Sequence, residues 1–150
     1  SIQKIALAAD VPAHETNVKL NKGITFWGYT LNTSTIRPKI PFRIVYFWKV
    51  LNEFDSDYNI LIKFVDKNGK IVFQQDHEPV YGLYKTSEWK ENERISEIYW
   101  LELPITVTPG IYYIYAGIGD KIIEKSESVY EKPLDLKSLR KVGTISVQKY

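Results

Sequence analysis

Apolar and polar residues alternate with a period of two along most of this chain, which is the pattern of half-buried β-strands. The clearest run covers 42–50, where one face carries Phe42, Ile44, Tyr46, Trp48 and Val50. Further strands are predicted at 2–9, 18–32 (with a turn at Lys22-Gly23), 98–103, 111–118, 121–127 and 142–149. Only 133–141 suggests a helical turn or two. The pattern therefore predicts an all-β fold with little or no helix.

Residues 58–77 predict a β-hairpin that turns at Asn68-Gly69. A two-residue type I′ turn requires positive φ at both positions, which Asn tolerates and Gly adopts freely. This turn predicts three facing pairs, namely Lys67 with Lys70, Phe64 with Phe73, and Val65 with Val72. One face of the hairpin then carries Ile60, Ile62, Phe64, Ile71 and Phe73, and a face this apolar requires a second layer against it.

The strands at 98–103 and 111–118 predict a second hairpin across Pro104–Gly110. Residues 78–97 lack periodicity and predict a long crossover from one sheet to the other, with Trp89 closing one end of the core. About eight to ten short strands separated by turns predict one antiparallel β-sandwich, jelly-roll or immunoglobulin-like, over residues 1–150.

Charge and composition exclude several classes of binding partner. Twenty basic and 18 acidic residues are scattered along the chain, so there is no basic stripe for nucleic acid. No apolar run reaches the length of roughly 18 residues that a membrane-spanning helix needs, so we expect no membrane insertion by this domain. The absence of Cys excludes disulfides and thiolate metal sites. A chain that begins at Ser1 and contains no Met is expected to be part of a longer protein.

The sequence contains few candidate metal-binding or catalytic residues. Asp55 and Asp57 resemble the start of a calcium loop, but Ile60 occupies the position that requires Gly, so we expect at most a weak calcium site and no cofactor. Asp76 is expected to cap a turn, with His77 at the surface. The motifs of common hydrolases and nucleotide-binding proteins are absent, which predicts a domain that is not an enzyme. A small glycoside hydrolase remains the catalytic alternative.

Aromatic residues supply the only candidate ligand site. Tyr113 and Tyr115 alternate away from the core-facing side of their strand, and Trp100 does so on the neighbouring one. Under one of two possible registers of the second hairpin, the three rings form an outer platform on which sugar rings can stack. In the alternative, the crossover or the C-terminal segment covers these rings as a satellite cluster.

Several motifs together resemble a known family. They are Trp27-Gly28-Tyr29, Val65-Asp66-Lys67-Asn68-Gly69, Gln75-Asp76-His77-Glu78-Pro79, the spacing Gly82-x3-Thr86-x2-Trp89, and Pro109-Gly110-Ile111-Tyr112. From about Trp27 to the last strand, the chain resembles the extracytoplasmic C-terminal β-sandwich domains of polytopic lipid-linked-sugar glycosyltransferases and related bacterial carbohydrate-associated sandwiches. It departs from the family pattern at Lys85, Asn92 and Ser96-Glu97, which predicts a different course for the crossover.

The resemblance implies a non-catalytic accessory domain outside the cytoplasm, in the periplasm or at the cell surface. Its expected partners are carbohydrate or the rest of its parent protein. Because fold alone does not specify function, a structural or protein-interaction module of a surface assembly remains an alternative.

Overall fold

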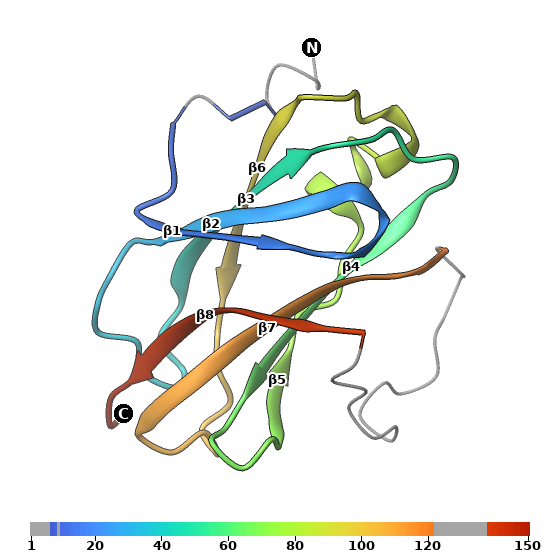
Figure 1. The fold of residues 1–150 in the computed structure, drawn as a ribbon. Helices are drawn as coiled ribbons and strands as arrows, with labels where there is room; N and C mark the ends of the chain where they lie inside the picture. Colours follow the sequence, from blue (N-terminus) through green and yellow to red (C-terminus); the bar gives the residue numbers. More distant parts are fainter. Residues whose placement is uncertain (1–6, 9, 122–137) are drawn as a thin grey trace.

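The computed structural model describes residues 7–8, 10–121 and 138–150, in which eight strands form two antiparallel sheets (Figure 1). The first sheet has the order β1 (His14–Lys19), β2 (Ile24–Leu31), β3 (Phe42–Val50), β6 (Arg94–Leu101). The second sheet has the order β5 (Ile71–Gln74), β4 (Tyr58–Val65), β7 (Gly110–Lys121), β8 (Arg140–Val147). The predicted antiparallel β-sandwich is confirmed.

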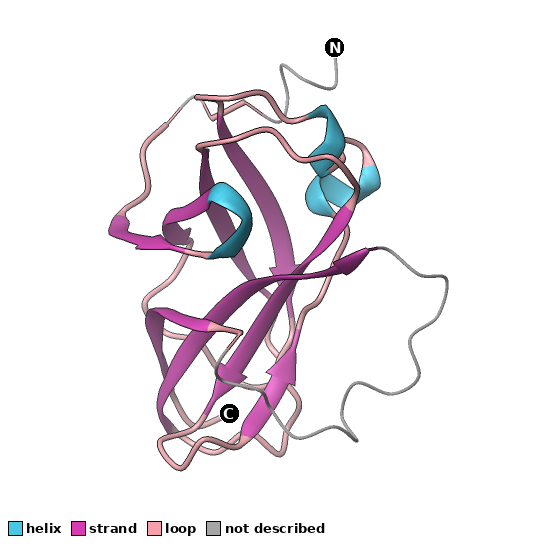
Figure 2. Ribbon diagram, turned by 45° about the vertical axis from the view of Figure 1, so that its right-hand side comes forward, coloured by secondary structure: helices cyan, strands magenta, loops and turns pink. Residues whose placement is uncertain are grey.

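Helix is limited to three short 3-10 segments in the described part of the chain, namely η1 (Asn21–Gly23), η2 (Pro79–Gly82) and η3 (Thr86–Glu88) (Figure 2). No helix in these residues has the length and apolar character needed to cross a bilayer. These short helical segments lie in the connections between strands, and the low helix content agrees with the prediction.

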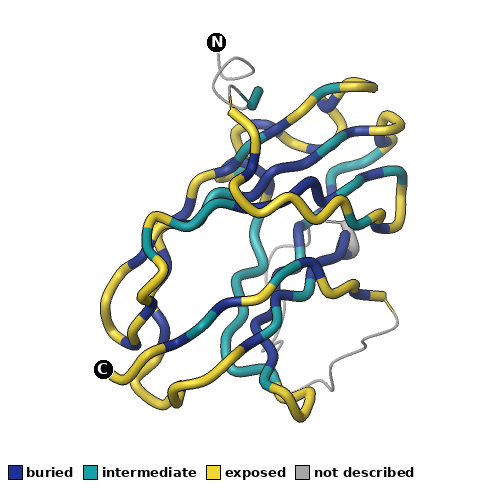
Figure 3. Tube along the Cα trace, turned by 60° about the vertical axis from the view of Figure 1, so that its left-hand side comes forward, coloured by how far each residue is buried: buried dark blue, intermediate teal, exposed yellow. Residues whose placement is uncertain are grey.

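The core lies between the two sheets and consists of alternate residues from every long strand. Buried positions recur along the strands, and exposed ones gather at turns and loops (Figure 3). Trp48 on β3 and Phe64 on β4 are 0% and 1% exposed and belong to one cluster, as their facing predicted. The sequence alternation therefore identifies the apolar face of each of these strands correctly.

The central hairpin forms, but its turn differs from the predicted type I′. Among residues 66–70 only Gly69 has a positive φ, of 86°. The carboxylate of Asp66 accepts hydrogen bonds from the amides of Asn68 and Lys70, both at 2.9 Å, and this local bonding favours a type I turn followed by a glycine bulge.

The altered turn changes the facing residues near it. Lys70 pairs with Asp66 rather than Lys67, and Val65 faces Ile71 rather than Val72. A second irregularity restores the predicted pairing of Phe64 with Phe73, whose rings lie 5.5 Å apart.

The predicted second hairpin is wrong, because β6 and β7 belong to different sheets. Residues 102–109 cross between the sheets, and their Leu103 and Val107 side chains are buried at the end of the sandwich. A Pro-Gly turn between two apolar runs fits a hairpin and a crossing connection equally well. The burial of these two residues, which depends on both sheets, favours the crossing.

Most other predicted strands form, although their boundaries shift by up to four residues. Residues 42–50 form β3 as predicted, and the 18–32 run turns at Lys22 and Gly23, both with positive φ, but β1 already begins at His14. The crossover ends at Glu93 rather than Glu97, because β6 begins at Arg94, earlier than predicted. The predicted strands at 2–9 and 121–127 lie almost entirely outside the described residues, apart from a bridge between Leu7 and Ile95. Of the helical turn predicted at 133–141, only 138–141 is described, and there the prediction is wrong because β8 already begins at Arg140.

We predict that Phe64→Ala destabilises the domain by about 3 to 5 kcal/mol, because it removes a fully buried aromatic ring from the core. Urea denaturation measures the change. Ile111→Ala, at a position 51% exposed on the neighbouring strand, is the matched control and should change stability by less than about 0.5 kcal/mol. Equal effects of the two substitutions would show that the facing of the central hairpin is misassigned.

Candidate functional site

Thr86 and Trp89 fix the crossover from β5 to β6, residues 75–93, to the core. The Thr86 hydroxyl accepts a hydrogen bond from the amide of Tyr58 (3.0 Å) and donates one to the loop before β4 (2.7 Å). The Trp89 indole is 1% exposed, and its N–H donates to the carbonyl of Tyr84 (2.9 Å). The Thr-x-x-Trp spacing therefore has a structural role, and the predicted burial of Trp89 is confirmed.

A carboxylate lies buried beside this crossover. Glu97, on the inner face of β6, is only 1% exposed. Its oxygens accept hydrogen bonds from the indole N–H of Trp48 (2.8 Å), the amide of Val80 (2.7 Å), the hydroxyl of Tyr99 (2.9 Å) and Nε2 of His77 (3.1 Å). A buried charge is tolerated when it is paired and its lone pairs are satisfied, and these four donors meet both conditions.

His77 is the cationic partner of Glu97, so the prediction that it lies at the surface is wrong. Its Nδ1 lies 2.9 Å from the carbonyl oxygen of Gln75, so both ring nitrogens face acceptors and the imidazolium form is favoured. Burial alone would lower the pKa of His77. The Glu97 charge and hydrogen bond, the Gln75 carbonyl and the charge of Asp76 together raise this pKa above its ordinary value.

Glu97 is held in its ionised form. Burial alone would raise its pKa, but the His77 charge and the hydrogen bonds from His77, Val80 and Trp48 lower it below the usual range. Burial and the Glu97 charge raise the pKa of Tyr99, which keeps its hydroxyl protonated as a donor. A carboxylate stabilised as an anion in this way is unsuited to act as a general acid.

Asp76, just after the end of β5, bonds to β4 of the second sheet and does not cap a local turn as predicted. One of its oxygens accepts a hydrogen bond from the amide of Ile62 (3.1 Å), and the other lies 2.6 Å from the ammonium of Lys63. The side chains of Asp76 and Lys63 are 20% and 5% exposed, so these two residues form a largely buried ion pair. Asp76 thus pairs with a residue of the second sheet, and His77 pairs with a residue of the first.

Two residues of η2 have a strained backbone. Val80 (φ 52°) and Tyr81 (φ 56°) both take the left-handed conformation, which is costly for side chains that carry a Cβ and especially for branched Val. Their amides donate to Glu97 and to the hydroxyl of Tyr99 (3.3 Å), respectively. The buried carboxylate cluster therefore stabilises the strained turn and fixes η2 against β6.

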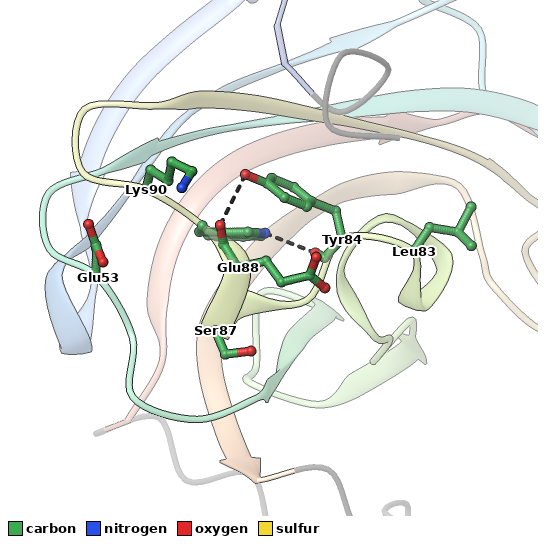
Figure 4. Close-up of a pocket in the computed structure, with 7 residues that line it drawn as sticks. Glu53, Leu83, Tyr84, Ser87, Glu88 and Lys90 are labelled. Atoms are coloured by element: carbon green, nitrogen blue, oxygen red, sulfur yellow. Dashed lines mark hydrogen bonds between the residues drawn. The ribbon is translucent and has the colours of Figure 1, made fainter. Parts of the chain in front are cut away.

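A hollow of about 420 Å³ opens at the crossover (Figure 4). Polar groups of Glu53, Ser87 and Lys90 surround it, and Tyr84 and Trp89 form part of its wall. These two rings are only 3% and 1% exposed, and their polar atoms are hydrogen-bonded within the crossover. Little ring surface is therefore available in this hollow for a ligand to stack on.

A larger groove, of about 580 Å³, lies on the outer face of the first sheet, and we call it the outer groove. Strands β2, β3 and β6 contribute Thr30, Arg43, Val45, Phe47, Ser96 and Ile98, and Leu7 with residues 10–13 forms one side. Gly28 on β2 lets the chain at His14 pack closely against this face, because a Cβ at Gly28 would lie 2.2 Å from the carbonyl oxygen of His14. The outer groove thus combines apolar and hydroxyl-bearing side chains with one arginine.

Trp100 lies beside Arg43 on this face, because the two residues are direct partners between β6 and β3. Its side chain is 62% exposed, which agrees with the prediction that it points away from the core. Ile98, two residues earlier on the same face, lines the outer groove. Trp100 therefore extends the outer groove with an accessible ring.

Trp100, Tyr113 and Tyr115 do not form the predicted platform. Trp100 lies on the first sheet, whereas both tyrosines lie on β7 in the second, so the three rings face opposite sides of the sandwich. The ammonium of Lys141 lies 3.9 Å from the ring centre of Tyr113. Alternation along a strand predicts which way a side chain points but not the sheet to which the strand belongs, and the error arose there.

The two calcium candidates are engaged in the loop before β4. A carboxylate oxygen of Asp55 accepts a hydrogen bond from the hydroxyl of Tyr58 (3.2 Å), and one of Asp57 accepts from the amide of Ser87 (3.1 Å). The hydrogen bond with Ser87 lowers the pKa of Asp57. Within the described ranges, no group of three or more His, Cys, Asp and Glu side chains is placed to hold a metal ion.

Sequence reasoning missed two residues, Glu97 and Arg43. Glu97 follows the alternation of Ile95 and Tyr99, so a strand predicted to begin at 94 would have placed it in the core. Arg43 alternates with the core-facing residues Phe42 and Ile44, which places it on the outer side of its strand. Its position beside Trp100 required the pairing of β3 with β6, which no local signal gives.

The His77–Glu97 pair predicts a pH-dependent stability. The folded pKa of Glu97 lies below 4.5 and that of His77 above 6.5, so both groups are charged between these values. The contribution of the pair should be largest there, and should fall as pH drops through the folded pKa of Glu97 or rises through that of His77. His77→Gln should therefore flatten the decline in melting temperature above pH 6.5.

The exposed His14 provides the matched control for this measurement. Thermal melts of His14→Gln across the same pH range should retain the decline of the unmodified domain. If the decline survived in His77→Gln, the ion pair would not be its source.

No protein-family model and no curated protein matches the chain. Among solved structures, the C-terminal domain of Wzt is similar over 91% of this chain and 82% of its own length, with a TM-score of 0.56 and 10% identity. A β-glucosidase from Listeria innocua in complex with glucose has a TM-score of 0.41 and 9% identity, and the match spans 81% of this chain but 16% of the enzyme. The similarity to the Wzt domain is one of fold: this chain is a β-sandwich with the architecture of that domain.

Proposed function

We propose that this chain is a non-catalytic accessory domain that binds carbohydrate on the outer face of its first sheet. The observation that carries the proposal is the exposed ring of Trp100 beside the outer groove. Sugar rings present apolar C–H faces that pack on aromatic rings, while their hydroxyl groups stay hydrated or bond to polar side chains. An exposed indole next to a groove with hydroxyl-bearing walls supplies both kinds of contact.

Trp100 differs from every other tryptophan of the chain. The other three are 4%, 0% and 1% exposed, and each indole N–H donates a hydrogen bond inside the protein, from Trp27, Trp48 and Trp89. Trp100 has no hydrogen-bond or ring partner among the described residues. Structural roles account for the three buried rings, and the fourth is free for a ligand.

The second sheet supports a ligand site less well. Tyr113 and Tyr115 are half-buried, and the Lys141 ammonium occupies one face of the Tyr113 ring. Tyr115 is the direct neighbour of Lys63 on β4, whose ammonium is already paired with Asp76. A role for the two tyrosines in binding stays a prediction, separate from that of Trp100.

The chemistry of the buried cluster supports a non-catalytic role. A glycosidase requires a carboxyl group whose pKa is raised so that it can protonate the leaving group. Glu97 has the opposite property, since four donors stabilise its anion inside the core. The cluster is therefore better explained as the anchor of the crossover.

The accessory role and the location belong to the proposal as well. The Wzt match is to the C-terminal domain of another protein, which supports a module of a larger chain. The extracytoplasmic location rests on the family resemblance of the sequence. Protection of the tagged domain from external protease in intact spheroplasts would contradict it.

The alternative of a protein-interaction module also draws on this face. Ile98 is 49% exposed beside Trp100, and β6 is an edge strand of the first sheet. The edge is partly closed, however, because the carbonyl of Arg94 accepts from Ala8 (2.8 Å) and that of Ile98 accepts from the Tyr81 hydroxyl. These contacts leave less backbone for strand addition and favour the carbohydrate proposal.

We predict that Trp100→Ala abolishes oligosaccharide binding without changing the melting temperature, because the exposed ring contributes to stacking and not to the core. Titration of the isotope-labelled domain with an oligosaccharide panel, followed by NMR, should give a Kd of about 0.1 to 1 mM for the unmodified protein. Tyr115→Ala, on the second sheet, is the control and should retain binding. Loss of binding in Tyr115→Ala alone would move the site to the second sheet, and absence of binding in the unmodified domain would favour the interaction module.

A further inference from the structure

Arg43 and Trp100 are neighbours on the outer face, and together their side chains favour one class of sugar. The two residues are directly opposed in the antiparallel pair of β3 and β6. Opposed residues in such a pair have Cβ atoms about 4.5 to 5.5 Å apart, so the two side chains leave the sheet next to each other on the same face. Both residues are exposed.

The Arg43 guanidinium is uncommitted. It has no hydrogen-bond, ion-pair or ring partner among the residues that the structure describes. Its backbone, in contrast, is fixed at both ends: its amide donates to the Asn32 side chain (2.8 Å), and its carbonyl accepts from the Asn32 amide (3.1 Å). The point at which the side chain leaves the sheet is therefore fixed, while the guanidinium donors stay available to a ligand.

Trp27, on the same face, provides a contrast, because cationic side chains already cover its ring. The ammonium of Lys49 and the guanidinium of Arg94 lie 4.9 Å and 5.0 Å from the Trp27 ring centre, and the ring is 4% exposed. There the cations cover the indole and complete the fold. At Trp100 no such contact exists within the described part of the chain, so both ring and cation remain accessible.

We propose that the outer groove binds an acidic glycan, with Trp100 stacking on a sugar ring and Arg43 bonding to that sugar's anionic group. This inference rests on the proposed carbohydrate-binding function. A guanidinium presents paired donors that match the two oxygens of a carboxylate or sulfate, and a neutral sugar leaves such a group without a charged partner.

The neighbouring charges locate the anionic group at the Arg43 end of the groove. Glu102, which follows the end of β6, is paired with Lys39 at 3.2 Å and does not oppose an incoming anion with a free charge. Asp10 lines the same groove on the N-terminal side, where it disfavours a second acidic group. The expected ligand therefore places one anionic sugar at Arg43 and less charged parts along the remaining groove.

NMR titration of the intact domain with matched oligosaccharides tests this inference. The probes are oligogalacturonate, alginate and hyaluronan oligomers, each beside its methyl-esterified form, in which the same sugars have lost their carboxylate charge. A sulfated carrageenan oligomer and its desulfated form make a second arm, which distinguishes sulfate from carboxylate. At least one anionic probe should bind about tenfold more tightly than its neutral counterpart, and added salt should reduce that difference.

Variants assign the charge recognition to Arg43. Arg43→Gln should remove the difference between anionic and neutral probes, and Arg43→Lys should restore part of it, because the charge returns without the paired donors. Arg140→Gln, at an exposed position on β8 in the second sheet, removes one positive charge elsewhere and should leave the difference unchanged.

The outcomes separate this inference from the function on which it rests. If anionic and neutral probes bound equally and Trp100→Ala abolished both, the acidic-glycan inference would be overturned and the carbohydrate-binding function would stand. A tenfold preference that persisted in Arg43→Gln would also overturn the role of Arg43. Absence of binding by every probe would overturn both proposals.

Discussion

The buried carboxylate of Glu97 is the constraint on which the arrangement of one side of this sandwich depends. Removing a carboxylate from water costs several kcal/mol, and the chain recovers this cost by directing donors at it from β3, β6 and the crossover, where His77 and η2 supply one each. No single strand could supply these donors. The carboxylate therefore joins segments that are far apart in the sequence, and it favours one path for the crossover among several that apolar burial alone would allow.

This constraint connects the interior to the outer face. The inner residues of β6, Glu97 and Tyr99, are held by the crossover, and the alternation of the strand then directs Ile98 and Trp100 outward. Pairing with β3 brings Arg43 beside Trp100. The proposed binding surface thus lies on a strand whose other face is fixed by charge and hydrogen bonding. The backbone that carries the ring therefore needs no reordering when a ligand binds.

The sequence predicted the elements that depend on local signals. The facing of β3 and β4, the position of the central hairpin and the burial of Trp89 all follow from alternation, turn residues and side-chain size. It failed where the outcome depends on distant partners. The bonding of Asp66 changed the turn type, and the burial of Leu103 and Val107 accompanies the placement of β6 and β7 in different sheets. His77 is largely withdrawn from solvent because it pairs with the buried Glu97. The candidate site was predicted in part, since the exposure of Trp100 is local, whereas its neighbour Arg43 is set by strand pairing.

The central claim is that Trp100 makes direct contact with a sugar ring on the outer face of the first sheet. The most direct measurement is the set of intermolecular nuclear Overhauser effects between a bound oligosaccharide and the aromatic protons of the labelled domain. The account predicts contacts from sugar C–H protons to the indole of Trp100, accompanied by contacts to Ile98. Contacts to Tyr113 or Tyr115 without any to Trp100 would contradict it.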